Sequence, residues 1–93
     1  MREKTIEQKF VAAVKAAEGL ALKFISPGFD GVPDRIVLLP GGKMAFVEVK
    51  APGEKPRPLQ MARHRLLRRL GFKVYVLDDE SQIGGIIDEI RAT

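Results

Sequence analysis

Three charged side chains near the middle of the chain have the types and spacing of a phosphodiester-cleaving site. Asp34 follows Val32-Pro33, and one residue, Val49, separates Glu48 from Lys50. Side chains two residues apart in a strand share a face, so Glu48 and Lys50 should point the same way. Asp34 and Glu48 would hold a hard cation such as Mg²⁺, with the Val49 carbonyl as a further ligand, and Lys50 would orient or help to deprotonate a water molecule.

The turn between the two strands decides whether these carboxylates can meet. A tight two-residue turn at Gly41-Gly42 would pair position 34 with position 49 and place Asp34 and Glu48 on opposite faces of the sheet. A shared metal site requires a register shifted by one residue, so that Asp34 and Glu48 lie on the same face of the sheet. We therefore predict an odd-length loop or a β-bulge between the two strands.

Two helices are expected to add polar groups. Glu7 lies on the edge of an apolar helical stripe and is a candidate water-mediated or second-metal ligand. Gln60 would position Lys50 or the water, and Arg63 would meet a phosphate. His64 and the later arginines of the same helix are expected to point outward, away from an apolar face made by Leu59, Ala62, Leu66, Leu67 and Leu70.

Each of these residues also has an ordinary structural explanation. Asp34 would suit a turn before a strand, Glu48 and Lys50 a solvated strand face, and Glu7 the first turn of a helix, where the dipole favours acids. Arginine stems on a basic helix often only cover apolar neighbours. Ser26, in a Ser-Pro-Gly turn, would either contact a phosphate or cap the turn. The combination of these residues with the order of the elements and the basic helix favours the functional explanation.

Alternating element types are predicted to position these residues. Thr5 and Gln8 form an apparent capping box for a first helix, whose apolar stripe stops at Gly19. Apolar runs bounded by Pro and Gly predict strands at 20–25, 32–39, 44–50 and 73–77, and helical spacing predicts helices at 58–70 and 83–90. Three strands in a meander followed by a helical crossover indicate an α/β fold with a mixed sheet between helices.

Length and composition limit the kinds of protein that this chain can be. The 93 residues, 45% hydrophobic and 30% charged, suit one globular domain over 1–93. The absence of cysteine and the single histidine exclude disulfide frameworks, Cys/His zinc sites and thiol nucleophiles. No apolar run approaches the ~18 residues of a membrane span, and the N-terminus lacks a signal-peptide core, so we expect a cytoplasmic protein with no membrane partner.

The charge of the chain is segregated along the sequence. The formal net charge is +4. Seven basic residues and no acidic one lie between Lys55 and Lys73, whereas Asp78 to Glu89 contains five acids. A polyanionic partner would therefore meet the basic segment.

As an ordered set, these motifs resemble the VRR-NUC (virus-type replication-repair nuclease) domain, a branch of the PD-(D/E)XK nuclease superfamily. The resemblance runs from Glu7 to Tyr75 and rests on Glu7, Gly31-Val32-Pro33-Asp34-Arg35, Phe46-Val47-Glu48-Val49-Lys50, Pro58-Leu59-Gln60 and Leu70-Gly71-Phe72. It implies a restriction-endonuclease-like αβββαβ(α) fold. Arg57 departs from the pattern, because a capping Ser or Thr usually precedes this helix.

The resemblance also implies Mg²⁺- or Mn²⁺-dependent cleavage of DNA that leaves a 5′-phosphate. Asp34 and Glu48 match the metal ligands, Lys50 the catalytic lysine, and Glu7 and Gln60 the accessory active-site positions. Stand-alone members of this size, often from phages and prophages, are similar to Holliday-junction resolvases in forming homodimers. We accordingly predict a homodimer acting on branched DNA, with DNA contacts from Ser26, Arg35, Arg57 and Arg63.

Two other functions stay open from the sequence. A catalytically silent DNA-binding or dimerisation module would bind DNA in a salt-dependent way without cutting it. An RNA-directed nuclease would use the same residues, because a phosphate does not identify its sugar. In either nuclease, so small a chain has little room for base readout, so recognition of shape is expected.

Overall fold

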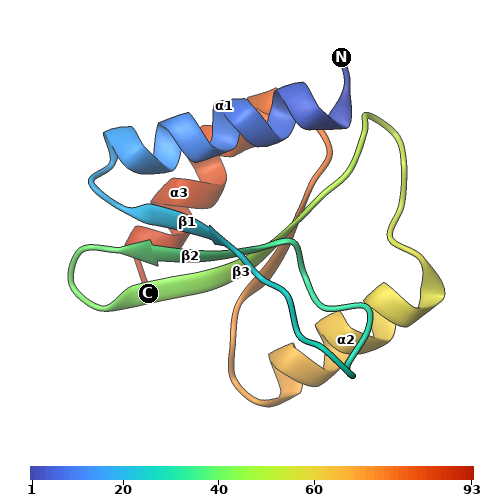
Figure 1. Ribbon diagram of the computed structural model, residues 1–93. Helices are drawn as coiled ribbons and strands as arrows, with labels where there is room; N and C mark the ends of the chain where they lie inside the picture. The colour runs from blue at the N-terminus through green and yellow to red at the C-terminus, as the bar shows by residue number, and fades with distance from the viewer.

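A four-stranded mixed sheet between helices forms the architecture of residues 1–93 in the computed structural model (Figure 1). The elements follow in the order α1 (Glu3–Ala16), β1 (Leu20–Lys23), β2 (Arg35–Leu39), β3 (Lys43–Val49), α2 (Pro58–Arg69), β4 (Val74–Leu77), a short 3₁₀ turn η1 (Glu80–Gln82) and α3 (Ile83–Arg91). The strands lie side by side in chain order, with β1, β2 and β3 antiparallel and β4 parallel to β3. The predicted α/β class and element order are confirmed.

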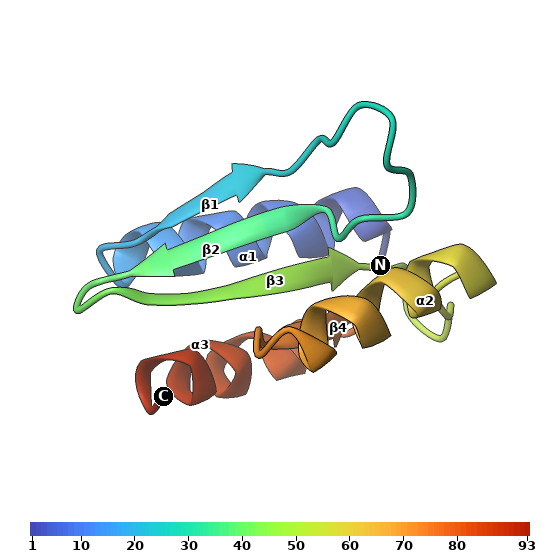
Figure 2. The same cartoon turned by 90° about the horizontal axis from the view of Figure 1, so that it is seen from below.

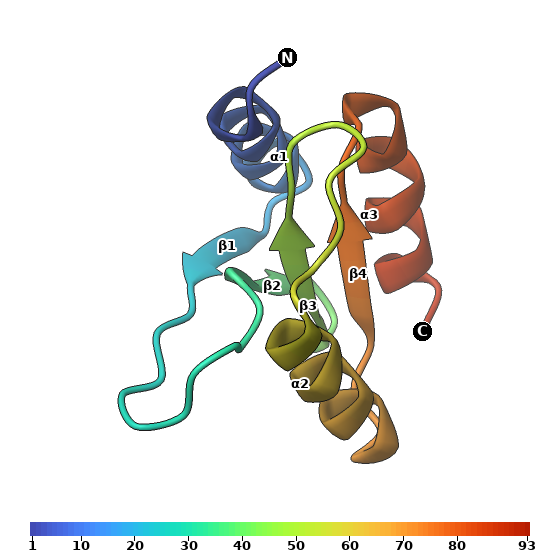
Figure 3. The ribbon, with the colours of Figure 1, turned by 90° about the vertical axis from the view of Figure 1, so that its right-hand side faces the viewer.

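One face of the sheet carries the main core, and α1 and α3 cover it (Figure 3). We call this side the core face. The strands contribute Val37, Leu39, Ala45, Val47, Val49 and Leu77 to it, and the helices contribute Ile6, Phe10, Val14, Ile83, Ile86, Ile87 and Ile90. The predicted stripe of the first helix is thus the surface that α1 buries.

The opposite face is defined by Ile36, Leu38, Phe46 and Glu48, and we call it the site face. The rings of Phe24, Phe46 and Phe72 cluster there, with centroid separations of 5.6 Å and 5.8 Å. Figure 2 shows α2 beside the end of β3, while β1 and β2 have no helix over them on this side. Consequently Leu20, Leu22 and Leu38 stay 58%, 45% and 38% exposed.

Helix α1 begins and ends differently from the prediction. It starts at Glu3, with Arg2 in the cap position and no side-chain cap, so the predicted capping box of Thr5 and Gln8 is wrong. The chain leaves the helix through Glu18, which adopts a positive φ of 63°. Gly19 then passes so close to the sheet that a Cβ would lie 2.5 Å from the Leu38 carbonyl oxygen. Glycine is required here by close packing against β2.

No helix of the structure has both the length and the apolar character needed to cross a membrane.

Candidate active site

The β2–β3 turn contains an odd number of residues, as a shared carboxylate site needs. Leu39 pairs with Lys43, so the loop Pro40-Gly41-Gly42 contains three residues. Both glycines take a positive φ, which such a short reversal requires. Because Arg35 pairs with Val47, the register continued by one residue sets Asp34 opposite Glu48. The predicted odd-length loop is confirmed, and both carboxylates belong to the site face.

Asp34 is held just before β2 rather than within a strand, since β2 begins at Arg35 instead of at 32. Its carboxylate Oδ2 accepts a hydrogen bond of 2.8 Å from the Val49 backbone N–H. Its carbonyl accepts another of 2.9 Å from the N–H of Phe24. A residue's N–H and C=O point to the same side of its strand, so the Val49 carbonyl also faces the Asp34 side.

Glu48 is fully buried, and its carboxylate lies among the side chains of Asp34, Lys50, Gln60 and His64. Gln60 Nε2 donates to Oε2 over 3.2 Å, and Lys50 Nζ lies 3.5 Å from the same oxygen. His64 Nε2 lies 3.4 Å from the other oxygen, Oε1. A buried carboxylate requires such partners, because loss of hydration would otherwise be costly.

Helix α2 presents a polar face to the sheet, which corrects two predictions. His64, expected to point outward, is only 2% exposed, and Gln60 is 6% exposed. Leu59 and Leu70, assigned to the apolar face, are 46% and 63% exposed. The helix is rotated because the strand surface beneath its N-terminal half carries Glu48, which polar side chains can satisfy and leucines cannot. The spacing of Gln60 and His64, one helical turn apart, was the available sequence signal.

Gln60 also determines how α2 begins. Its Oε1 accepts a 2.9 Å hydrogen bond from the Arg57 N–H, which leaves its amide nitrogen directed at Glu48. The helix starts at Pro58, as predicted, although Arg57 supplies no side-chain cap. Gln60 thus supplies the N3 half of a capping box by satisfying the backbone N–H of the cap residue. It contacts Glu48 directly and makes no hydrogen bond to Lys50.

The two carboxyl groups influence each other's protonation. Burial raises the pKa of Asp34 to about 6, and the negative charges of Glu48 and Glu7 contribute to this rise. The hydrogen bond from the Val49 N–H acts in the opposite direction and lowers the pKa. Burial also tends to raise the pKa of Glu48, but hydrogen bonds from His64 and Asp34 and the charge of Lys50 outweigh it and lower that pKa. Below about pH 6 the pair therefore keeps one proton, which resides on Asp34, while Glu48 stays ionised.

The donor set suits a hard divalent cation. Two carboxylates on adjacent strands and a main-chain carbonyl supply only oxygen, which Mg²⁺ and Mn²⁺ prefer. Nowhere are three or more His, Cys, Asp or Glu side chains grouped as metal ligands. That agrees with Mg²⁺ sites, which commonly use one or two carboxylates and complete the shell with water and substrate phosphate.

Glu7 lies beside the carboxylate pair but already has a partner. Arg35 Nε donates to Glu7 Oε2 over 2.9 Å, and Arg35 Nη1 donates to the Ala21 carbonyl over 3.0 Å. Glu7 and Asp34 both line a cleft of about 300 Å³ between the start of α1 and the segment after β1. Glu7 therefore faces the approach to the site, with its charge balanced by Arg35.

The remaining residues predicted to bind DNA lie around the β1–β2 loop and α2. Arg63 donates to the Asp30 carbonyl over 2.7 Å, and its guanidinium lies 3.8 Å from the centre of the Phe29 ring. Arg35 and Arg63 are thus both bound to the protein itself, and their contact with DNA stays a prediction. The Ser26 carbonyl accepts from the Phe29 N–H and closes the turn, while Arg57 is exposed at the start of α2.

Comparison with known proteins gives consistent results. The sequence model of the VRR-NUC domain matches residues 3–79. A solved structure described as "VRR_NUC domain" superposes with a TM-score of 0.87 at 33% identity, covering 92% of this chain and 94% of the other. The protein named "Putative nuclease p44" from Acyrthosiphon pisum secondary endosymbiont phage 1 is 54% identical over 80 residues, which are 86% of each chain.

The fold and the family match place the chain among nuclease domains. More narrowly, it belongs to the VRR-NUC family.

Proposed function

We propose that residues 1–93 form a single domain that hydrolyses DNA phosphodiester bonds as a metal-dependent endonuclease. The observation that carries this proposal is the β2–β3 register, which sets Asp34 opposite Glu48 on the face that also bears Lys50. Two carboxylates and one ammonium at one end of the two central strands suit hydrolysis of a phosphodiester. Membership of a nuclease family supports the same chemistry.

Asp34, Glu48 and the Val49 carbonyl would hold Mg²⁺ or Mn²⁺. When bound, such an ion polarises the scissile phosphate and makes water a better nucleophile at neutral pH. Asp34 is already oriented by the Val49 N–H, and Glu48 by Gln60 and His64, so the ligands need little rearrangement.

Lys50 supplies the fixed positive charge of the site. Its Nζ lies 3.5 Å from Glu48 Oε2, and its side chain is only 13% exposed. From this position the ammonium can orient the attacking water or stabilise negative charge that develops on the phosphate oxygens. Glu7, which faces the same cleft as Asp34, would hold a second ion or an ordered water.

We further propose that the substrate is recognised by shape, as branched DNA. The basic segment from Lys55 to Lys73 includes all of α2, so the phosphate backbone can approach the site along this helix. Arg57 and Ser26 would add contacts on either side of the site. The short loops of so small a domain offer little surface to read bases.

A homodimer would let two sites cut opposite strands of one junction. Each chain carries one carboxylate pair, so paired cuts require a second copy. The uncovered part of the site face supports this proposal, because exposed Leu20, Leu22 and Leu38 form an apolar strip that a second copy would bury.

The decisive experiment compares cleavage of linear duplex, flap and four-way-junction DNA by the wild type and Asp34→Ala. Each DNA is incubated with Mg²⁺, Mn²⁺ or EDTA, and an RNA duplex of the same sequence is included. We expect metal-dependent, paired cuts at the junction that the variant loses, with unchanged circular dichroism. The loss should be on the order of 10³-fold, as for other groups that act on transition-state charge.

Other outcomes would contradict parts of this proposal. Salt-dependent DNA binding without cutting in any metal would identify a silent binding module instead. Preferential cutting of the RNA duplex would identify an RNA-directed nuclease. Full activity of Asp34→Ala would show that the carboxylate pair is not the active site, and unpaired cuts would argue against the dimer.

A further inference from the structure

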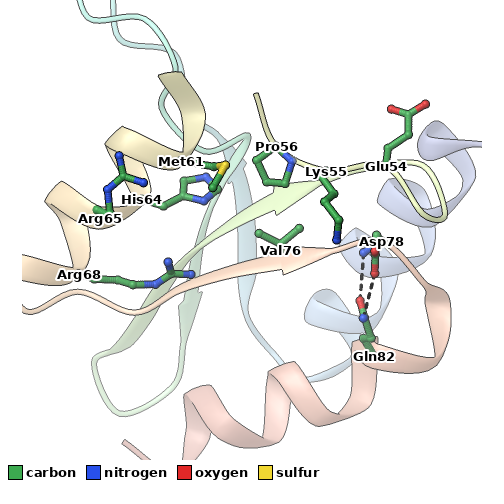
Figure 4. A pocket seen from close by; sticks show the side chains of 10 residues that line it. All are labelled: Glu54, Lys55, Pro56, Met61, His64, Arg65, Arg68, Val76, Asp78 and Gln82. Carbon is green, nitrogen blue, oxygen red and sulfur yellow. Dashed lines mark hydrogen bonds between the residues drawn. The ribbon is translucent and has the colours of Figure 1, made fainter. Parts of the chain in front are cut away.

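His64 has no assigned function, although it is one of the most buried side chains of α2. It is 2% exposed and lies between Glu48 and a cavity of about 600 Å³. Figure 4 shows this cavity bordered by α2, β4 and the segment 54–56, with the imidazole among the side chains that line it. His64 is thus placed between the carboxylate of the candidate site and a cavity on the other side of the ring.

The contacts of Glu48 divide between its two oxygens. Gln60 and Lys50 both lie against Oε2, at 3.2 Å and 3.5 Å. Of the two side chains that α2 directs at this carboxylate, only His64 reaches Oε1, at 3.4 Å. An ionised carboxylate only accepts hydrogen bonds, so the imidazole must present an Nε2–H to it, which the neutral ring can do.

We propose that His64 is a positioning residue that sets the orientation of Glu48 for cation binding. Gln60 and His64 lie four residues apart on α2, and together they hold both oxygens of the carboxylate from one rigid element. Contact at one oxygen alone leaves rotation about the terminal bond of Glu48, whereas contact at both suppresses it. This inference rests on the proposed metal-dependent nuclease and assigns one more residue to that site.

Such outer partners of metal ligands have measurable consequences. Their removal commonly costs about 10- to 100-fold in metal affinity or activity. The cost arises because the ligand spends less time in the binding orientation, even though the fold stays intact. The effect of His64 should therefore appear in cation binding itself, before any DNA is added.

The test uses Mn²⁺ alone as the probe, with free Mn²⁺ measured by electron paramagnetic resonance during titration of the protein. His64→Leu keeps the bulk but removes the donor, and His64→Asn keeps polarity but is too short to reach Oε1. His64→Gln places a side-chain N–H near the position of Nε2. Met61→Ala is the control, because Met61 lines the same cavity and offers no hydrogen-bond donor to Glu48.

We expect His64→Leu and His64→Asn to raise the Kd for Mn²⁺ by about 10- to 100-fold. His64→Gln should bind Mn²⁺ nearly as the wild type does, and Met61→Ala should be unchanged. In cleavage assays, the Mn²⁺ concentration at half-maximal rate should rise in the same two variants, while saturating Mn²⁺ restores most of the rate. Thermal unfolding of each variant verifies that it is folded.

Wild-type Mn²⁺ affinity in folded His64→Leu or His64→Asn would overturn the assignment. So would a His64→Gln variant as weak as His64→Leu, because the ring's packing and not its hydrogen bond would then matter. Failure of the proposed function is distinguishable: a wild type that binds Mn²⁺ but cuts no nucleic acid contradicts the nuclease activity and leaves the role of His64 testable by binding. A wild type that binds no Mn²⁺ contradicts both.

Discussion

The core face and the site face of one sheet use the same strands for opposite purposes. Along β3, Val47 and Val49 pack against α1 and α3, while Glu48 between them points to α2. Two long apolar stripes cover the core face, but α2 covers only part of the site face and does so with Gln60 and His64. Stability is thus concentrated on one side and chemistry on the other, so substitutions on the two faces should be separable in experiments.

Replacing Lys50 should produce the largest effect, and the loss of activity should far exceed the loss of stability, because Gln60 and His64 still contact Glu48. Lys50→Met removes the ammonium beside Glu48, and we expect cleavage to fall on the order of 10³-fold, which corresponds to about 4 kcal/mol of transition-state stabilisation. Lys43→Met at the other end of β3 is the control, since Lys43 Nζ donates to the C-terminal Thr93 carbonyl and lies away from Glu48. Comparable losses in both variants, measured in single-turnover assays, would show that the lysines act through general charge.

Truncation of Leu77 should show the reverse pattern. Leu77 is fully buried on the core face, so Leu77→Ala should lower the free energy of unfolding by about 3 kcal/mol. Leu22→Ala on the uncovered site face, where Leu22 is 45% exposed, should cost well under half of that. Urea unfolding measures both. At a temperature where it is folded, Leu77→Ala should cut DNA at nearly the wild-type rate. Equal destabilisation by the two variants would refute the division between faces.

The smallest of the three effects should come from the β1–β2 loop, which carries Asp34 on the site face. Gly28 and Gly31 both have a positive φ, so alanine at either should cost about 1 kcal/mol. Only at Gly31 would the new Cβ meet a neighbour, 2.9 Å from Leu59 Cγ. We expect Gly31→Ala to shift the loop and slow cleavage about 10-fold, because small displacements of reacting groups are costly. Equal rates for the two variants would show that the loop tolerates this shift.

Short-range spacing was enough to locate the carboxylates and the lysine. The odd parity of the β2–β3 loop was also predictable, since a shared site excludes a two-residue turn, and the three-residue loop bears this out. The stripe of α1 was predictable because Ile6, Phe10 and Val14 fit only one helical face.

The orientation of α2 could not be read from its own residues. Its leucines at 59, 66, 67 and 70 suggested the buried side, yet the helix turns Gln60 and His64 inward. Which side a short helix buries depends on the surface it meets, and here that surface presents a carboxylate. The tertiary structure likewise decided that Arg35 donates to Glu7 and that Arg63 donates to the Asp30 carbonyl.

By itself, the sequence determined the order of the elements, the apolar stripes of α1 and α3 and the set of three candidate site residues, because these follow from residue types, side-chain periods of 2 or 3.6 residues and turn chemistry. Only the tertiary structure decided how Glu48 is held, which made His64 an inward residue and let Gln60 start α2 while contacting the carboxylate. The physical reason is that a buried charge must be hydrogen-bonded by side chains from other packed elements. The positions of those side chains follow no periodic pattern along the chain.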